Sequence, residues 1–287
     1  MAHIWIILVG MVAASGCSLL GCFLILRKMA MIGDAISHAV LPGLVIAFLL
    51  SETRSSIPML IGAALVGLLT TVIIELLNTK AKMQADASIG ITFTFLFAVG
   101  IILVSLYTSK IDLDQDCVLF GEIAYVPLDI LSLKSGLILG PRALWIVSAN
   151  LAFILIFIRF GFKGLQLTTF NPEFAQTVGI NIAVWQYALM GSISLTTVLN
   201  FELVGAILVV AFLIVPPATA YLCTSRLKTM LWLSVVFACA SAVLGFLLAS
   251  WLNGSIAGGM STASGILFTA VFIAKQLIKI KLSTNRS

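Results

Sequence analysis

The sequence MAMIGDAISHAVLPGLVIAFLL, residues 29–50, is apolar enough and long enough to cross a membrane, yet it contains Asp34 and His38. A helix needs about 20 predominantly apolar residues to span the hydrocarbon core of a bilayer. Each ionisable side chain near the centre of such a helix costs roughly 2.5–3.5 kcal/mol on insertion scales. The stretch therefore predicts a membrane-spanning helix in which the carboxylate and the imidazole have a function that offsets this cost.

The composition of the whole chain indicates the same class of protein. Of its 287 residues, 61% are hydrophobic and 9% are charged, whereas a soluble domain carries about 25% charged residues. The apolar runs are continuous and not alternating, which argues against a β-barrel. We predict an all-α, polytopic bundle of eight or nine spans that forms a single transmembrane domain over residues 1–287. Nine apolar blocks lie at 4–26, 29–50, 57–77, 89–109, 143–158, 186–199, 201–223, 229–250 and 261–278, and the segment 123–140 is a weaker candidate.

The distribution of basic residues predicts the orientation. Twelve of the 16 Lys and Arg residues fall in alternate loops or in the C-terminal tail. By the positive-inside rule, these loops and the C-terminus are cytoplasmic. Nine spans would put the N-terminus outside, and eight would put it inside. The net charge of +5 reflects this bias and does not indicate a nucleic-acid partner. The twelve are Arg27, Lys28, Lys80, Lys82, Arg159, Lys163, Arg226, Lys228, Lys275, Lys279, Lys281 and Arg286.

A polar stretch at 159–186 predicts a short cytoplasmic helix between two spans. Asn171 is a typical N-cap and Pro172 suits the first helical turn. Glu173 then lies near the positive end of the helix dipole, and Gly179 is placed to end the helix after about two turns. We expect this region, about 171–181, to be a docking element.

Four motifs together carry a resemblance to a known family. The spacing Glu173-x-Ala175-x-x-x-Gly179 resembles the E-A-A-x-x-x-G loop of ABC importer permeases, which inserts into a cleft of the ATPase subunit. GDAISHAVLPG at 33–43, LFGEI at 119–123 and VGAILVVAFLIVPPATA at 204–220 are similar to segments of the ABC-3 family. The chain is therefore identified as a member of that family, the inner-membrane permeases for manganese, zinc and iron.

The resemblance implies a multi-pass permease of the bacterial inner membrane, which is a transport subunit and not an enzyme. It implies that Mn²⁺, Zn²⁺ or Fe²⁺ is transported and that no cofactor is permanently bound. The implied partners are a cytoplasmic ABC ATPase that uses ATP, an extracytoplasmic metal-binding protein, and a second permease subunit that is either a second copy or a sister chain. Glu173, Ala175 and Gly179 would couple the permease to the ATPase. The sequence contains no Walker A motif, so we expect ATP hydrolysis on another polypeptide.

Asp34 and His38 are four residues apart, so on a helix they share one face with Cβ atoms roughly 5–6 Å apart. A carboxylate and an imidazole together suit Mn²⁺, Fe²⁺ or Zn²⁺. The alternative is an ion pair that locks two helices together. Pro42-Gly43 follows one turn later and can break the helix, which would open carbonyl groups to a pathway. Two ligands do not complete a shell, so a second Asp–His pair from the partner permease is expected.

Other acidic residues have open interpretations. Glu202 lies between two apolar blocks, where it either faces the same path as a third metal ligand or is a lone acid in a loop. We interpret Glu75 as structural and expect it to pair with Lys80 or Lys82. Asp112, Asp114 and Asp116 form an acidic loop that either concentrates cations, or binds a basic rim of the binding protein, or is simply solvated.

The chain departs from the family pattern near its last span. NGSIAGG at 253–259 stands where many members have Asp-x-Pro-x-Gly-Pro, and this difference favours a heterodimer with a sister permease that carries the missing groups. Two alternative functions remain. One is an ABC permease for a metal chelate or siderophore, which would not need the Asp–His pair. The other is a proton-coupled secondary transporter that uses Asp34 and His38 as a relay.

Overall fold

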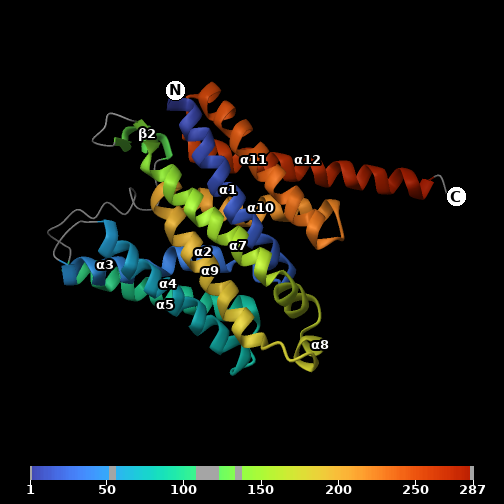
Figure 1. Ribbon diagram of the computed structural model, residues 1–287, viewed down its shortest axis with the longest axis horizontal. Helices are drawn as coiled ribbons and strands as arrows, with labels where there is room; N and C mark the ends of the chain where they lie inside the picture. The colour runs from blue at the N-terminus through green and yellow to red at the C-terminus, as the bar shows by residue number, and fades with distance from the viewer. Residues whose placement is uncertain (1, 52–55, 108–122, 133–137, 285–287) are drawn as a thin grey trace. The chain divides into compact units, whose positions relative to one another are not determined.

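The computed structural model describes residues 2–51, 56–107, 123–132 and 138–284 (Figure 1). Within these ranges, nine helical segments are long and apolar enough to cross a membrane, which confirms the predicted all-α, polytopic class. One of the nine is divided into two helices, α2 and α3. The helices of the spans are α1 (Ala2–Leu26), α2 (Ile32–Ala39), α3 (Leu41–Ser51), α4 (Ser56–Thr79), α5 (Ala85–Tyr107), α7 (Arg142–Phe170), α9 (Ile182–Val204), α10 (Ala206–Cys223), α11 (Leu227–Leu252) and α12 (Ile256–Thr284).

The weaker candidate at 123–140 is not a span. Its described part forms a 3₁₀ helix, η1 (Ile123–Leu128), and two short strands, β1 (Ile130–Ser132) and β2 (Ile138–Pro141). The strands pair antiparallel, with Ile130 opposite Pro141. Pro127 lies inside η1, where the shorter 3₁₀ repeat tolerates it better than a long α-helix would.

The chain divides into two compact units. The first comprises Met1–Ile25, Glu122–Leu151 and Ile207–Ser287, and the second comprises Leu26–Gly121 and Ala152–Ala206. The second unit contains α2, the helix with Asp34 and His38, together with α3, α4, α5 and α9. The prediction of a single domain over 1–287 stays a prediction.

In the first unit, α11 and α12 form a tightly packed helical hairpin (Figure 1). Asn253 ends α11 in the left-handed conformation, with φ of 50°, which Asn tolerates better than most residues. A Cβ atom on Gly245 would lie 2.2 Å from the Cα atom of Met260, so only glycine allows this approach of the two backbones. The segment 253–259 therefore builds a close turn between two spans.

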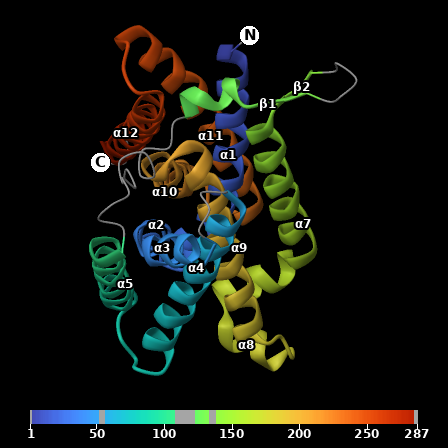
Figure 2. The same cartoon turned by 90° about the vertical axis from the view of Figure 1, so that its left-hand side faces the viewer.

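In the second unit, α2 is enclosed by α4, α5 and α9, which all pack against it (Figure 2). The helices α3 and α4 approach closely at a pair of glycines. A Cβ atom on Gly43 would lie 2.4 Å from the carbonyl oxygen of Gly62, and one on Gly62 would lie 2.5 Å from that of Gly43. Small residues at helix crossings are typical of membrane proteins, because packing there depends on close approach of the backbones.

The helix α7 is longer than its apolar block of 143–158 predicted. It continues through Arg159 and Lys163, which are both exposed, and ends at Phe170. Long basic side chains can cover apolar surface with their stems while the charged head reaches water. Arg159 ended the predicted apolar block, but the helix itself continues for eleven more residues, to Phe170.

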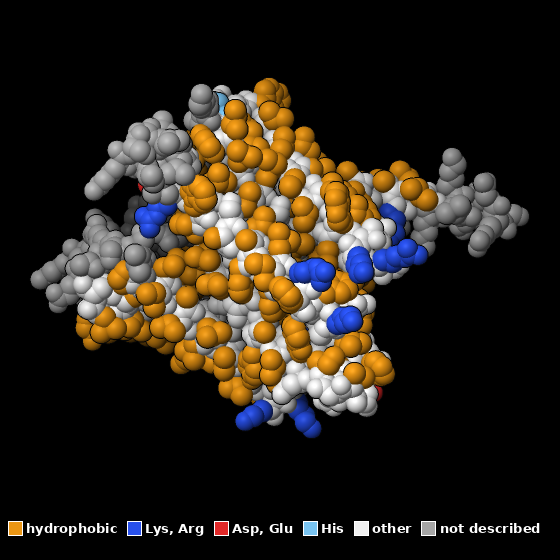
Figure 3. All heavy atoms as spheres, viewed as in Figure 1, with side chains coloured by type: hydrophobic (Ala, Val, Ile, Leu, Met, Phe, Trp, Pro, Cys, Tyr) orange, Lys and Arg blue, Asp and Glu red, His pale blue; other side chains and the backbone are white. Residues whose placement is uncertain are grey.

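The outer surface of the helices is largely apolar. On the face drawn in Figure 3, hydrophobic side chains cover most of the helical surface, and Lys and Arg side chains gather in small groups. Large apolar side chains such as Phe160 and Leu155 are exposed on α7. This exposure is expected where the solvent is lipid, since hydrocarbon does not penalise apolar side chains.

The hairpin of α11 and α12 supplies a matched test of packing. We expect Gly245→Ala to lower stability by about 1–3 kcal/mol, because the added methyl group meets backbone atoms that cannot rotate away. Gly265→Ala on α12 is the control: a Cβ atom there meets nothing within 4 Å, and the change should be neutral or slightly stabilising. Thermal unfolding of the two purified variants in detergent measures the difference. Equal melting temperatures would contradict the close approach.

Candidate functional site

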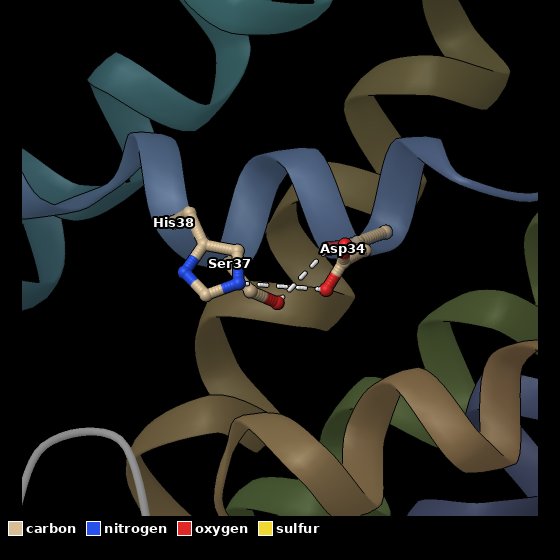
Figure 4. A network of polar contacts seen from close by, with 4 residues as sticks. Asp34, Ser37 and His38 are labelled. Carbon is tan, nitrogen blue, oxygen red and sulfur yellow. Dashed lines mark hydrogen bonds and ion pairs between the residues drawn. The ribbon is translucent and has the colours of Figure 1, made fainter. Parts of the chain in front are cut away.

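The pair Asp34 and His38 lies on α2, as the spacing predicted. His38 Nε2 is 3.6 Å from Asp34 Oδ1, and both side chains project from the same side of the helix (Figure 4). The other six residues of α2 are all buried, whereas the side chains of His38 and Asp34 are 34% and 39% exposed. The ionisable side chains of α2 are thus the partly exposed ones. A helix that faced lipid would instead expose apolar side chains.

The ion pair does not bridge two helices, because both partners come from α2. The structural alternative, in which the pair locks two helices together, therefore has no support in this geometry. Ser37 on the same helix donates a hydrogen bond of 2.9 Å to the carbonyl oxygen of Gly33. The Ser37 hydroxyl group is therefore bonded within the helix, and Asp34 and His38 are the polar side chains of α2 that remain available to a ligand.

The end of α2 is set by Pro42, which has no N–H group to donate to the carbonyl oxygen of His38. The helix is interrupted at Val40 and resumes as α3. The break is slight, since Val40 N donates to Ile36 O at 3.1 Å and Leu44 N donates to Val40 O at 3.1 Å. The predicted opening of carbonyl groups is therefore modest. Gly43 serves the close packing of α3 on α4 instead.

Two aromatic rings of α5 flank the imidazole. The ring centroid of His38 is 5.9 Å from that of Phe93 and 5.6 Å from that of Phe97, the second in an edge-to-face arrangement. One turn further along α5, a Cβ atom on Gly100 would lie 2.9 Å from Pro42 Cδ. The same face of α5 therefore contacts both the imidazole and the helix break, and it limits the rotation of the His38 ring.

The separation of the two donor atoms suits a shared cation. Metal–ligand bonds to imidazole nitrogen and carboxylate oxygen are about 2.0–2.2 Å, so donors 3.6 Å apart would subtend an angle of roughly 110–130° at the ion. Such an angle fits tetrahedral or distorted higher coordination. Within the described residues, no group of three or more His, Cys, Asp and Glu side chains is placed to hold a metal ion. The pair therefore supplies only part of a coordination shell.

The other predicted acids are placed differently. Glu202 lies within α9 and not in a loop, because the helix continues to Val204 and Gly205 ends it with φ of 89°. The side chain of Glu202 lies outside the described part of the structure, so its role as a third ligand stays a prediction. Asp112, Asp114 and Asp116 also lie outside the described residues.

The predicted short helix is present as α8 (Pro172–Thr177). Asn171 is its N-cap, and its side-chain oxygen accepts a hydrogen bond of 3.0 Å from the backbone of Phe174. At the other end, Gly179 has φ of 82°, and Ile180 N donates to Ala175 O at 2.9 Å. A left-handed glycine with this bond closes a Schellman motif. The predicted start and end of the helix are therefore confirmed.

Of the three predicted coupling residues, the structure buries Ala175 completely and exposes Glu173 and Gly179. Two apolar side chains that the sequence reasoning missed are also exposed on this segment, Phe174 at 51% and Val178 at 57%. They are four residues apart, so they share one side of the turn. In the sequence, the signal for this exposed apolar pair was the four-residue spacing of Phe174 and Val178 within a polar stretch.

The expected pairing of Glu75 with Lys80 or Lys82 is wrong. Glu75 is 91% buried in the second unit, and its Oε2 accepts a hydrogen bond of 3.0 Å from Gln186 Nε2. Gln186 in turn accepts a hydrogen bond from Arg27. The two lysines lie beyond the end of α4 and are exposed, whereas α9 packs beside Glu75 in the fold and brings Gln186 to it.

Among the described residues, nine helical segments are long and apolar enough to cross a membrane, and one of them carries the half-open Asp–His pair. These features define a multi-pass membrane protein. The model of the ABC 3 transport family matches residues 2–277. The chain belongs to this family and is a permease subunit of an ABC transporter.

Known proteins resemble the chain over nearly its whole length. The manganese transport system membrane protein MntD of Bacillus subtilis (strain 168) is 44% identical over 98% of this chain and 95% of the relative. The zinc transport system membrane protein TroD of Treponema pallidum (strain Nichols) is 39% identical over 93% of this chain and 72% of the relative. Among solved structures, PsaBC from Streptococcus pneumoniae in complex with Fab has a TM-score of 0.76 and 32% identity, covering 96% of this chain and 94% of that one.

Proposed function

We propose that this permease imports a divalent transition metal ion, Mn²⁺, Zn²⁺ or Fe²⁺, and that Asp34 and His38 are ligands in its transport path. The observation that carries the proposal is the inverted pattern of α2, in which six residues are buried and the two ionisable ones are open. Lipid would penalise this arrangement, whereas a path for a cation requires it. The names of the relatives, which refer to manganese and zinc, support the same substrate class.

The pair favours a bare ion over the two alternatives. A chelate or siderophore satisfies the metal with its own donor atoms and would not need a carboxylate and an imidazole in the path. A proton-coupled secondary transporter would not need α8, with its capped ends and exposed Phe174 and Val178. A transported ion must also be released, so a site with few ligands from each subunit is suited to the task.

A second permease subunit would complete the coordination shell. Since the described residues offer no third ligand of the usual types near the pair, we infer that another Asp–His pair faces this one across a dimer. Either a second copy of the chain or a sister permease would supply it. The half-open side chains of Asp34 and His38 would then lie at the interface and not against lipid.

Transport would be driven by a separate ATPase subunit that docks on α8. An exposed carboxylate, Glu173, stands beside the exposed apolar pair of Phe174 and Val178, and Ala175 anchors the helix from below. Exposed apolar side chains in a polar loop are typical of a partner surface. The ATPase, and with it the hydrolysis of ATP, would lie on the cytoplasmic side.

The orientation follows from the basic residues. With nine spans, the positive-inside rule places the N-terminus outside and the loop with α8 in the cytoplasm. The membrane would be the cytoplasmic membrane of a bacterium. An extracytoplasmic metal-binding protein would deliver the ion to the opposite side, where the acidic loop of Asp112, Asp114 and Asp116 is expected.

The transport path is tested by removing its ligands one at a time. We expect Asp34→Asn and His38→Gln each to abolish metal uptake with little loss of inserted protein, because a costly group leaves the bilayer. Ser37→Ala is the matched control on α2, since its hydroxyl group bonds only within the helix. Uptake of radioactive manganese and zinc into cells, with protein yield, measures the effect.

The structural alternative predicts a different result for the same pair. If Asp34 and His38 formed only a stabilising bridge, the single variants would be unstable, and Asp34→Asn/His38→Leu would regain stability and transport. Transport by this double variant would contradict the proposal.

The aromatic flank of His38 is tested by a comparison within α5. We expect Phe97→Leu to raise the KM for metal uptake by about 3- to 10-fold, because an aromatic pair contributes roughly 0.5–1.5 kcal/mol to holding the imidazole. Phe95→Leu is the control, since Phe95 is 63% exposed on another side of α5. Initial uptake rates across a range of metal concentrations give both values. An unchanged KM in the Phe97 variant would show that α5 does not orient the imidazole.

The docking role of α8 is tested by Glu173→Lys and Gly179→Pro. The first reverses a charge on the exposed face, and the second is incompatible with φ of 82° and with the hydrogen bond from Gly179 N to Gln176 O. We expect both permeases to insert normally but to lose uptake and co-purification of the ATPase. Gln166→Lys, at an exposed position of α7, is the control. Normal uptake with undiminished substrate-stimulated ATP hydrolysis in both variants would refute docking at α8.

A further inference from the structure

A partly buried polar network surrounds Arg27, which follows the last residue of α1. Its Nε donates to Thr169 Oγ1 at 3.1 Å, and its Nη2 donates to Thr168 Oγ1 at 3.0 Å. Its Nη1 donates to Gln186 Oε1. The amide of Gln186 is also a donor, with Nε2 3.0 Å from Glu75 Oε2. Gln186 therefore joins a cation and a carboxylate, and all five residues belong to the second unit.

Three of these residues flank the short helix α8. Thr168 and Thr169 lie in the last turn of α7, just before it, and Gln186 lies in the second turn of α9, just after it. The network is therefore attached to both ends of the segment on which the ATPase is proposed to dock.

The two flanks are themselves packed together by Trp185. A Cβ atom on Gly161 would lie 2.5 Å from the indole ring, and one on Gly164 would lie 2.3 Å from it. The ring also lies 6.4 Å from that of Phe157, centroid to centroid. Because the indole fills a groove that only glycines leave open, the end of α7 and the start of α9 are held as one body around α8.

On its other side, the network reaches the start of α2. Gln186 Nε2 lies 3.9 Å from the sulfur atom of Met29, and Ile32 N donates to Met29 O at 3.2 Å. Only a short turn separates Arg27 from α2, which begins at Ile32. The guanidinium group of Arg27 is therefore only a few residues from the helix with Asp34.

Burial makes the network resistant to separation. A buried charge is tolerated only while it is paired and hydrogen-bonded. Burial lowers the pKa of Arg27 to about 10, and the charge of Glu75 acts against that decrease, so the guanidinium group keeps its proton at neutral pH. The attached segments therefore move together more easily than they come apart.

We propose that Arg27 and Gln186 are positioning residues that transmit a displacement of α8 to α2 and so set the position of the Asp34–His38 pair during transport. The proposal rests on the proposed docking of an ATPase at α8. In the sequence analysis, Arg27 served only as one of the basic residues that predict the orientation in the membrane; here it also has a role in transport. In this role, Gln186 is the link that connects the hairpin of α7, α8 and α9 with both Arg27 and Glu75.

The test uses the complete transporter, with permease, ATPase and binding protein, in proteoliposomes. The variants are Gln186→Leu, which removes both hydrogen bonds of the amide, and Arg27→Lys, which keeps the charge but loses the three-way fork. Lys28→Met is the matched control, because Lys28 is the exposed neighbour of Arg27. Two quantities are measured: radioactive manganese taken up per ATP hydrolysed, and labelling of Met31→Cys by a maleimide with and without ATP–vanadate trapping. Met31 is 51% exposed just before α2, and mass spectrometry resolves its labelling from that of the natural cysteines.

We expect Gln186→Leu to assemble and hydrolyse ATP, but to lower uptake per ATP by about tenfold, in the range of typical coupling energies. The nucleotide-dependent change in labelling at position 31 should disappear, Arg27→Lys should be intermediate, and Lys28→Met should match the wild type. A purely structural role would reduce the amount of complex and leave uptake per ATP unchanged. An unchanged ratio, or a preserved labelling change, in Gln186→Leu would overturn the proposal.

Two further outcomes are also decisive. If Gln186→Leu fails to assemble, Thr169→Val removes a single acceptor beside α8 and should lower uptake per ATP in the same way, and an unchanged ratio there would overturn the proposal. If the labelling change at position 31 is present without further substitution and disappears in Gln186→Leu, while none of manganese, zinc and ferrous iron is taken up, the metal assignment fails and the role of the network is upheld.

Discussion

An ion pair inside a membrane-spanning segment is the constraint on which the second unit is built. Asp34 and His38 cannot face lipid without a large penalty, yet the proposed transport path requires them as ligands of a dehydrated cation. The fold meets both demands by burying the six other residues of α2 and leaving this one side half open. The helices α4, α5 and α9 enclose the rest of α2, and glycines at 43, 62 and 100 allow α3, α4 and α5 to approach closely enough to do so.

A second polar cluster, around Arg27, lies just before the start of α2. Glu75 is buried and Arg27 is partly buried, and Gln186 pairs with each through opposite ends of its amide. The two polar sites are joined by the turn from Arg27 to α2. These two clusters of ionisable groups are therefore connected, one proposed to hold the transported ion and one proposed to link it with α8.

Local sequence signals predicted the secondary-structure elements well, but they predicted the contacts between those elements poorly. Continuous apolar runs located the spans, and Asn171, Pro172 and Gly179 located α8, because capping depends on neighbouring residues alone. The extension of α7 past Arg159 was missed because a charge was taken as a boundary. The partner of Glu75 was missed because Gln186 is 111 residues away, and Phe93 and Phe97 were missed because apolar residues in a span look alike until α5 is placed against His38. The spacing of Asp34 and His38 was predictable, since both lie on one helix.

The central claim is that a dehydrated ion is held by Asp34 and His38 of two permease subunits. X-ray absorption spectroscopy of the purified transporter loaded with manganese or zinc tests it most directly. We predict one ion for each pair of permease chains, with imidazole scattering and nitrogen or oxygen ligands at about 2.0–2.2 Å, and loss of the imidazole signal in His38→Gln. A spectrum of a fully hydrated ion, or an imidazole signal that persists in His38→Gln, would contradict the account.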